Sequence, residues 1–277
     1  MTRHTRFYLG TCAALLGACS EADPLDPSDS ATLNADIAAA VADGVGEDVQ
    51  TMRELSQGLR FGVMFLSSSA QSPPGGCPYD AASGWHDCEP VELPNGLTID
   101  RQYAFYNAAG APMENFDAEQ TASIRAQRVV DGDIERETEH GSLAASVHHE
   151  RDFTVSGLQG DEQKRTWNGT GSSDISRTRV SDEHGTRIYE LSADVTVSNV
   201  EVPRHNNTDR DPWPLSGTIT KQVEGSVTKD GETRSFERTV VITFNGTQFA
   251  TATVTGADGT ETFEIDLANR NAGRHRP

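Results

Sequence analysis

From Leu97 to Leu267 the sequence alternates apolar and polar residues with a period of two, and turn-forming residues interrupt the alternation at short intervals. Successive side chains of a β-strand point to opposite faces of a sheet, so this pattern predicts strands with one buried face. The turn signals lie at Asp131-Gly132, 157–160, Asn168-Gly169, 182–185, Asp230-Gly231, Asn245-Gly246 and Asp258-Gly259. Short turns of this kind join antiparallel neighbours, and we expect about ten strands here.

The pattern is clearest in the last third of the chain, where it predicts a four-strand meander. The predicted strands are 215–228, 233–244, 247–255 and 260–267. Asn245-Gly246 is typical of a type I′ turn, because both residues tolerate positive φ angles. We predict an antiparallel β domain over 96–268, followed by a basic tail over 269–277.

The strands before the meander are polar on both faces. The segment 134–140 carries Glu135, Glu137 and Glu139 on one side, and 146–155 has few large apolar residues. Two packed sheets require more inward-facing apolar side chains than this. The sequence therefore favours one large curved antiparallel sheet, or an open half-barrel, and a two-sheet sandwich is the alternative.

Residues 31–66 are predicted to be a helical segment that packs on the concave face of the sheet. Apolar residues recur there every three or four positions, at Leu33, Ile37, Val41, Val45, Val49, Met52, Leu55 and Leu59. This spacing places them on one helical face. Ser30 is a candidate N-cap, and Gly44 and Gly46 predict a break in the helix. The run 61–66 could be a buried strand or a continuation of the helix.

The polar side of this helix is predicted to carry carboxylates. They are Asp36, Asp43, Glu47, Asp48 and Glu54. A membrane-binding role for the helix is disfavoured, because anionic lipid repels such a face.

The N-terminus begins with Arg3 and Arg6 and continues into an apolar run over 7–18 that is too short to span a bilayer. A charged start and a short apolar run ending in small residues are typical of a cleaved export signal. The motif Leu16-Gly17-Ala18-Cys19 resembles the lipobox of bacterial lipoproteins. The alternative is an ordinary secretory signal that contains a cysteine.

The lipobox resemblance implies that 1–18 is a signal peptide and that Cys19 carries the lipid. The acidic, proline-bearing segment 19–30 then serves as a tether. Ser20 follows the cysteine, so the resemblance favours a cell-envelope protein of the outer membrane. Pro214-Leu-Ser-Gly-Thr-Ile-Thr and 238–247 weakly resemble uncharacterised lipoproteins of Gram-negative bacteria, a likeness that implies no function.

The segment 67–95 is rich in Ser, Pro and Gly and is predicted to be irregular. It contains Cys77 and Cys88, the only cysteines left after removal of the signal and modification of Cys19. In an oxidising compartment such a pair forms a disulfide. The rival hypothesis is a metal site that joins both thiols to His86, which lacks a fourth ligand at suitable spacing.

The charge of the chain excludes nucleic acid as a partner. The formal net charge is −19, and removal of the two arginines of the signal leaves 21 basic against 42 acidic residues, or −21. A surface this acidic repels phosphate backbones.

Catalytic motifs are missing from the sequence. The nucleophile elbow, the P-loop, the Rossmann glycines and Cys-x-x-Cys do not occur. His149-Glu150 begins a zinc-protease motif, but Phe153 occupies the position of the second histidine. His148 and His149 are expected on opposite strand faces, as a surface pair.

Two weaker patterns resemble binding sites. Asn207, Asp209 and Asp211 alternate as calcium ligands do, but Pro212 and Thr218 stand where a calcium loop needs Gly and Glu, which favours solvated turn residues. Trp85, Trp167 and Trp213 could form a sugar-stacking platform, although scattered tryptophans more often cover a core or an edge.

The sequence thus predicts a membrane-anchored, noncatalytic envelope lipoprotein without a cofactor, whose β-sheet is a binding or structural surface. Its partner is a hydrophobic ligand or an envelope protein. The alternative is an envelope hydrolase that uses carboxylates on the sheet, such as those of the Glu135, Glu137 and Glu139 stripe.

Overall fold

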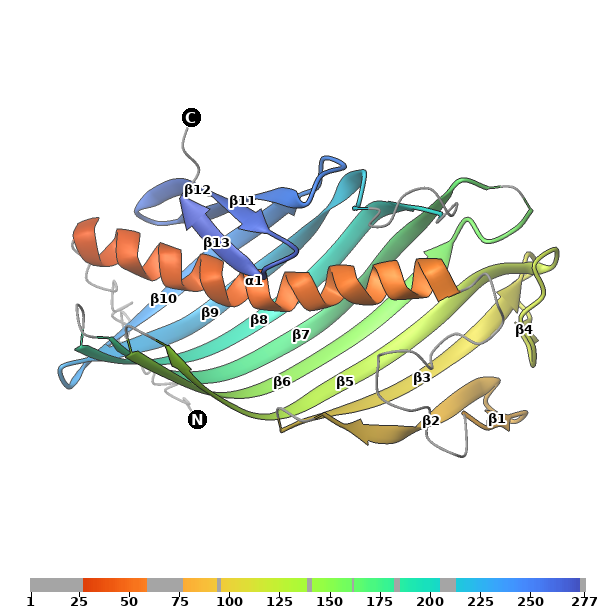
Figure 1. Ribbon diagram of the computed structural model, residues 1–277, viewed down its shortest axis with the longest axis horizontal. Helices are drawn as coiled ribbons and strands as arrows, with labels where there is room; N and C mark the ends of the chain where they lie inside the picture. Colours follow the sequence, from red (N-terminus) through yellow and green to blue (C-terminus); the bar gives the residue numbers. More distant parts are fainter. Residues whose placement is uncertain are drawn as a thin grey trace, which may run out of the picture.

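In the computed structural model, one long helix and one antiparallel sheet of 13 strands form the body of the protein (Figure 1). The residues described are 27–58, 77–93, 96–138, 141–160, 162–181, 185–204 and 213–274. The elements are α1 Pro27–Gly58, β1 Tyr79–Asp80, β2 Trp85–Glu92, β3 Leu97–Asn107, β4 Pro112–Met113, β5 Thr121–Thr138, β6 Gly141–Ser156, β7 Lys164–Ser181, β8 Gly185–Pro203, β9 Ser216–Lys229, β10 Glu232–Thr243, β11 Phe249–Gly256, β12 Gly259–Asp266 and β13 Asn271–Arg274.

The sheet is a meander in which each strand pairs with its neighbours in the sequence, and the short β4 pairs beside β3. The sheet curves around α1, which crosses the inner face of the long strands, and β11 to β13 turn over the same helix (Figure 1). Accordingly, α1 contacts β8, β11, β12 and β13. The predicted single curved sheet with an N-terminal helix is confirmed, and the sandwich alternative is not formed.

The core lies between α1 and the inner face of the sheet. Leu33, Ile37, Val45, Val49 and Met52 of the helix are all buried, as the helical spacing predicts. The strands meet them with buried side chains at alternate positions, including Phe153, Val155, Val195, Val197, Val240 and Ile242. Full burial of an aliphatic or aromatic side chain of this size contributes about 1.5–3 kcal/mol, so this interface is the main source of stability.

The helix differs from its prediction in two ways. It begins at Pro27, so Ser30 lies within the first turn and is buried. It also continues without a break through Gly44 and Gly46. A Cβ atom on Gly44 would stand 3.1 Å from Lys221 Nζ, and one on Gly46 would stand 2.6 Å from Arg270 Cγ. The two glycines therefore allow close packing on both sides of the helix.

Some predicted turns are correct and others are not. Asp230 and Gly231 have φ angles of 54° and 85° and connect the paired residues Lys229 and Glu232, so they form the two-residue type I′ turn. The type I′ prediction for Asn245-Gly246 is wrong, because Gly246 has a positive φ and Asn245 does not. That connection spans five residues, and β11 begins only at Phe249.

Two further predicted turns lie inside strands. β5 runs through Asp131-Gly132 and β7 runs through Asn168-Gly169. A Cβ on Gly169 would lie 2.8 Å from Phe153 Cδ1, so this glycine serves close strand packing. Opposite it, β8 contains a bulge with Asn199 at a φ of 49°. The extra residue lets both Val197 and Val200 face the core.

The stretch 67–95 is less irregular than predicted. β1 and β2 lie within it, and β2 pairs with β3. Cys77 and Cys88 form the predicted disulfide, with an S–S distance of 2.05 Å. At the other end, β13 lies in the predicted tail and pairs with β12. The run 61–66 lies outside the described residues.

Candidate functional site

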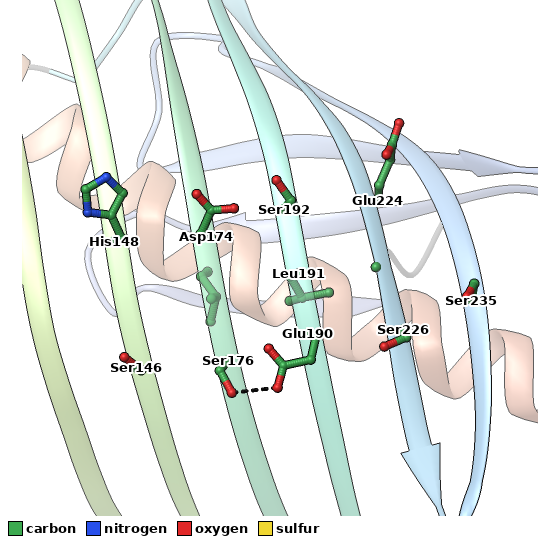
Figure 2. Close-up of a pocket in the computed structure, with 12 residues that line it drawn as sticks. Ser146, His148, Asp174, Ser176, Glu190, Leu191, Ser192, Glu224, Ser226 and Ser235 are labelled. Atoms are coloured by element: carbon green, nitrogen blue, oxygen red, sulfur yellow. Dashed lines mark hydrogen bonds between the residues drawn. The ribbon is translucent and has the colours of Figure 1, made fainter.

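The outer face of the sheet, turned away from α1, carries an open hollow of about 550 Å³ across β6 to β10. Figure 2 shows the side chains of His148, Asp174, Ser192 and Glu224 projecting to the side opposite the helix. The period of two places them there, since their sequence neighbours face the core. The lining is made of hydroxyls, carboxylates, one imidazole and the edges of two apolar residues: Ser146, His148, Asp174, Ile175, Ser176, Glu190, Leu191, Ser192, Glu224, Gly225, Ser226 and Ser235.

Strand register arranges these groups in rows across the sheet. Asp174 lies opposite Ser192, and Ser192 lies opposite Glu224. In the adjacent row Ser176 donates a hydrogen bond to Glu190 Oε1 at 2.8 Å (Figure 2). Asp174, Glu190 and Glu224 are all exposed. The hollow therefore presents exposed carboxylates separated by hydroxyl groups.

His148 stands at the edge of this hollow between two carboxylates. Its Nδ1 is 2.5 Å from Asp131 Oδ1 and its Nε2 is 3.3 Å from Glu150 Oε1. The hydrogen bond to Asp131, supported by the one to Glu150, raises the pKa of His148, whose side chain is 39% exposed. An imidazolium at this position is already neutralised by its two partners.

A second hollow of about 730 Å³ lies on the outer face of β3, β5, β6, β7 and β8. A chain of polar contacts crosses it: Gln102 donates to Gln127 at 2.6 Å, Gln127 donates to Asp152 at 2.9 Å, and Arg125 Nε donates to Asp152 at 2.8 Å. The bond from Arg125 lowers the pKa of Asp152. Asp87, Asp100, Glu150 and Asp194 add carboxylates to the rim.

The inner face has the opposite charge. The cationic side chains at inward positions of β5 to β10 include Arg128, Arg151, Arg165, Arg177, Arg179, Arg187, Lys221 and Arg238, next to His149. The carboxylates at outward positions of the same strands are Asp131, Asp133, Glu135, Glu137, Glu150, Asp152, Asp174, Glu190, Asp194, Glu201, Glu224 and Glu237. The sheet therefore separates charge by face.

Helix carboxylates neutralise part of the inner charge. Asp48 accepts from Arg151 Nε at 3.0 Å, and both side chains are 4% exposed. Asp36 accepts from Arg187 Nη1 at 2.8 Å and from Arg179 and the hydroxyl of Tyr189. These contacts correct the prediction that the helix carboxylates form a separate polar side, because Asp36 and Asp48 are buried against the sheet.

Burial strongly shifts the pKa of several inner groups, among them His149 and Lys221. Burial, followed by repulsion from Arg151 and Lys221, lowers the pKa of His149 to about 3. Burial and the charge of Arg151 lower the pKa of Lys221 to about 8. His148 and His149 do lie on opposite faces as predicted, but His149 is buried, so the interpretation as a surface pair is wrong.

The other residues considered from the sequence do not assemble into a site. Cys19, Glu139, Asn207, Asp209 and Asp211 lie outside the described residues, and Glu135 and Glu137 are exposed on β5. The tryptophans are apart: Trp167 is in the core, Trp85 faces the Arg125 guanidinium and Trp213 lies under that of Arg53.

The ring nitrogens of His86 face the backbone carbonyls of Cys77 and Glu114. Among the described residues, no three His, Cys, Asp or Glu side chains are arranged to hold a metal ion.

Sequence reasoning missed the paired helix carboxylates. Asp36 and Asp48 are twelve residues apart and face inward-pointing arginines more than 100 residues later in the chain. The sequence did contain one usable signal. In β6, β7 and β8, arginines occupy some of the alternate positions that otherwise carry buried apolar residues, and a buried cation needs a partner.

Comparison with models of protein families, with curated proteins and with solved structures gave no match. The described helix α1 lacks an apolar stretch long enough to cross a bilayer.

Proposed function

We propose that this chain is a lipid-anchored, noncatalytic binding protein of the bacterial cell envelope, and that the outer face of β5 to β10 binds a cationic segment of another envelope protein. The observation that carries the binding role is the separation of charge by face. The outward carboxylates are mostly exposed and aligned in rows, whereas five of the inward cations, Arg151, Arg165, Arg187, Lys221 and Arg238, are buried.

The partner class follows from the chemistry of the outer face. Carboxylates and hydroxyls accept hydrogen bonds from ammonium and guanidinium groups, and a long acidic surface attracts a cationic segment over a distance of about 10 Å at 0.1 M salt. The two outward cations of β5 to β8, Arg125 and Lys164, are themselves paired with Asp152 and Glu201. They leave the surface strongly negative.

The two other predicted functions have less support. A hydrophobic ligand carried in the concavity would have to lie where α1 packs on the sheet. A hydrolase needs a pair of carboxylates with distinct environments, one of them kept protonated. The carboxylates of the outer hollow are exposed, and the buried Asp36 and Asp48 are held by arginines.

The anchor proposal is supported by Leu16-Gly17-Ala18-Cys19 and by the acidic segment that follows it. Outer-membrane location rests on Ser20. The test is a Cys19→Ser variant expressed in a Gram-negative host. We expect the wild-type chain in the outer-membrane fraction with the mass of a lipidated cysteine, and the variant in the soluble periplasm. An unmodified, soluble wild-type chain would contradict the anchor without affecting the binding surface.

The binding proposal is tested by calorimetric titration with a decalysine peptide, with decaglutamate as the charge control. The triple variant combines Asp174→Asn, Glu190→Gln and Glu224→Gln. It is expected to bind decalysine at least about tenfold more weakly, because each exposed ion pair contributes roughly 0.5 kcal/mol. The matched control neutralises Glu92, Glu119 and Glu264, which are exposed elsewhere. Equal weakening by both sets would show that net charge alone attracts the peptide and would contradict a defined surface.

A further inference from the structure

Four arginine side chains are buried among the described residues, and three of them form an ion pair with a carboxylate. These pairs are Arg151–Asp48, Arg187–Asp36 and Arg238–Asp258, with nitrogen–oxygen distances of 3.0, 2.8 and 2.9 Å. The fourth is Arg165 of β7, which is 2% exposed. The fold thus supplies a counter-charge to every buried guanidinium of this set except one.

Arg165 has no ion pair within the described residues, and its buried Nε and Nη1 atoms have no hydrogen-bond acceptor. Burial, followed by repulsion from Arg204, lowers its pKa to about 10, and the attraction of Glu162 only partly opposes this. A buried arginine with two unused donors is unusual, because the large majority of buried polar atoms in native proteins are paired.

A third unused donor belongs to the same strand. Trp167 is two residues further along β7, so its side chain projects from the same face, and it is fully buried. Its indole Nε1 also lacks an acceptor. The ring packs edge-on against Phe153, with centroids 5.9 Å apart. Within the part of the chain that the structure describes, this end of the inner face therefore contains three buried donor atoms without a hydrogen-bond acceptor.

We propose that Arg165 and Trp167 form part of a binding site for an oxyanion, a carboxylate or phosphate group, on the inner face of β7. A guanidinium and an indole N–H can only donate, so their complement is a group that only accepts. Water could fill the hydrogen bonds, but it would leave the buried positive charge uncompensated, which is costly. An oxyanion supplies both the hydrogen-bond acceptors and the negative charge, and the planar guanidinium of arginine matches its geometry. This site is independent of the outer binding surface.

The first experiment measures thermal unfolding of the full chain at pH 7 and constant ionic strength, with sodium phosphate, sodium acetate or sodium chloride. A midpoint that rises and saturates with phosphate or with acetate supports the site, and the stronger of the two identifies the anion class. Equal midpoints in all three salts would overturn the proposal and assign the donors to water.

The variant Arg165→Met distinguishes two hypotheses: that Arg165 binds an external anion, and that a group of the chain itself is its partner. Without added anion it is expected to be at least as stable as wild type, because it removes a buried charge that lacks a counter-charge. Its apparent affinity for the anion should fall at least about tenfold, since a charge-assisted hydrogen bond is lost. Arg151→Met is the matched control and should lose stability equally in every salt. A loss of the same kind for Arg165→Met, without an anion response, would contradict the proposal.

A second readout applies to the wild-type chain, so it decides the question even where the variant does not fold. The three tryptophans give three indole N–H signals in a ¹⁵N-correlated NMR spectrum, and Trp167→Phe assigns one of them. On titration with phosphate or acetate, the Trp167 signal should move with saturation while those of Trp85 and Trp213 stay in place. No selective shift with either anion would overturn the site.

Discussion

Residues 148–152 of β6 deliver the same kinds of side chain to two different environments. Arg151 points inward and pairs with Asp48, and both side chains are 4% exposed. Asp152 points outward and pairs with Arg125, at 31% and 45% exposure. Likewise His149 is buried among cations, whereas His148 lies between carboxylates near solvent. One strand therefore contains two matched pairs of groups that differ mainly in their exposure to water.

The two faces are suited to different roles. Inside, an unpaired charge is costly, and the inner ion pairs of Asp36 and Asp48 fix the position of α1 on the sheet. Outside, water solvates the charges, and their contribution to stability is small. The outer carboxylates are therefore free to serve binding, and the inner ones are not.

The largest expected effect is on the inner pair. Asp48→Asn leaves Arg151 buried without a counter-charge, and it should lower the free energy of unfolding by about 3–5 kcal/mol. Urea denaturation followed by circular dichroism measures this change. Asp174→Asn on the outer face is the matched control, expected within about 0.5 kcal/mol of wild type.

The double variant Asp48→Leu with Arg151→Met tests the cause of that loss. Replacement of both charges by apolar groups should recover most of the stability, because the damage in the single variant is the unpaired charge. A double variant as unstable as Asp48→Asn would show that lost side-chain packing, and not the unpaired charge, causes the destabilisation. The inner face would then not depend on charge pairing.

The two histidines should respond to pH in opposite directions. The pKa of His149 falls from 6.5 to about 3 on folding, so the unfolded chain binds a proton that the folded chain rejects. Stability is then unaffected above pH 6.5 and decreases between about pH 6.5 and 3, by about 3 kcal/mol at pH 4. For His148, whose folded pKa is raised, stability is gained below the ordinary pKa and lost as the pH rises through the folded value.

The measurement is the pH dependence of urea unfolding for wild type, His149→Leu and His148→Gln. His149→Leu should flatten the decrease between pH 6.5 and 4, and His148→Gln should steepen it slightly, because that side chain is screened by solvent. Parallel curves for wild type and His149→Leu would show that His149 takes up its proton without opening the core.

A smaller effect is expected where the helix is closest to β12 and β13. Alanine normally stabilises a helix relative to glycine by about 1 kcal/mol. At Gly46 the new methyl would meet the stem of Arg270, so Gly46→Ala should destabilise by about 1 kcal/mol instead. In an Arg270→Ala background the same change should become stabilising. Thermal unfolding of wild type, the two single variants and the double variant gives the sign of the stability change caused by Gly46→Ala in each background. The same sign in both backgrounds would show that Arg270 moves aside freely.

The general fold could be predicted from the sequence because its determinants are local. Alternation over 215–267 defines β9 to β12, and the helical spacing from Leu33 to Met52 defines the buried face of α1. The breaks predicted at Gly44 and Gly169 were wrong for one reason. Each glycine admits a group from a distant segment, and local propensity contains no information about such long-range packing.

The candidate sites were less predictable for the same reason. The disulfide could be deduced, since Cys77 and Cys88 had no other partner. The rows of the outer hollow depend on strand register, which aligns Asp174 with Ser192 and Glu224 only after the three long strands β7, β8 and β9 pair in order. Neither the composition nor any motif identifies Arg165 as a candidate, because the absence of an acceptor for its side chain is a property of the packed core.

The smallest expected effect is on the outer ion pair. A double-mutant cycle of Arg125→Ala and Asp152→Ala should give a coupling energy of about 0.2–1 kcal/mol, typical of an exposed pair. That coupling should shrink in 1 M salt, where the screening length is about 3 Å. The corresponding cycle for Arg151 and Asp48 should hardly change, because water and ions do not enter between two side chains that are 4% exposed. Equal salt sensitivity of the two cycles would mean that the inner pair opens to solvent, and the two faces would then differ in degree only.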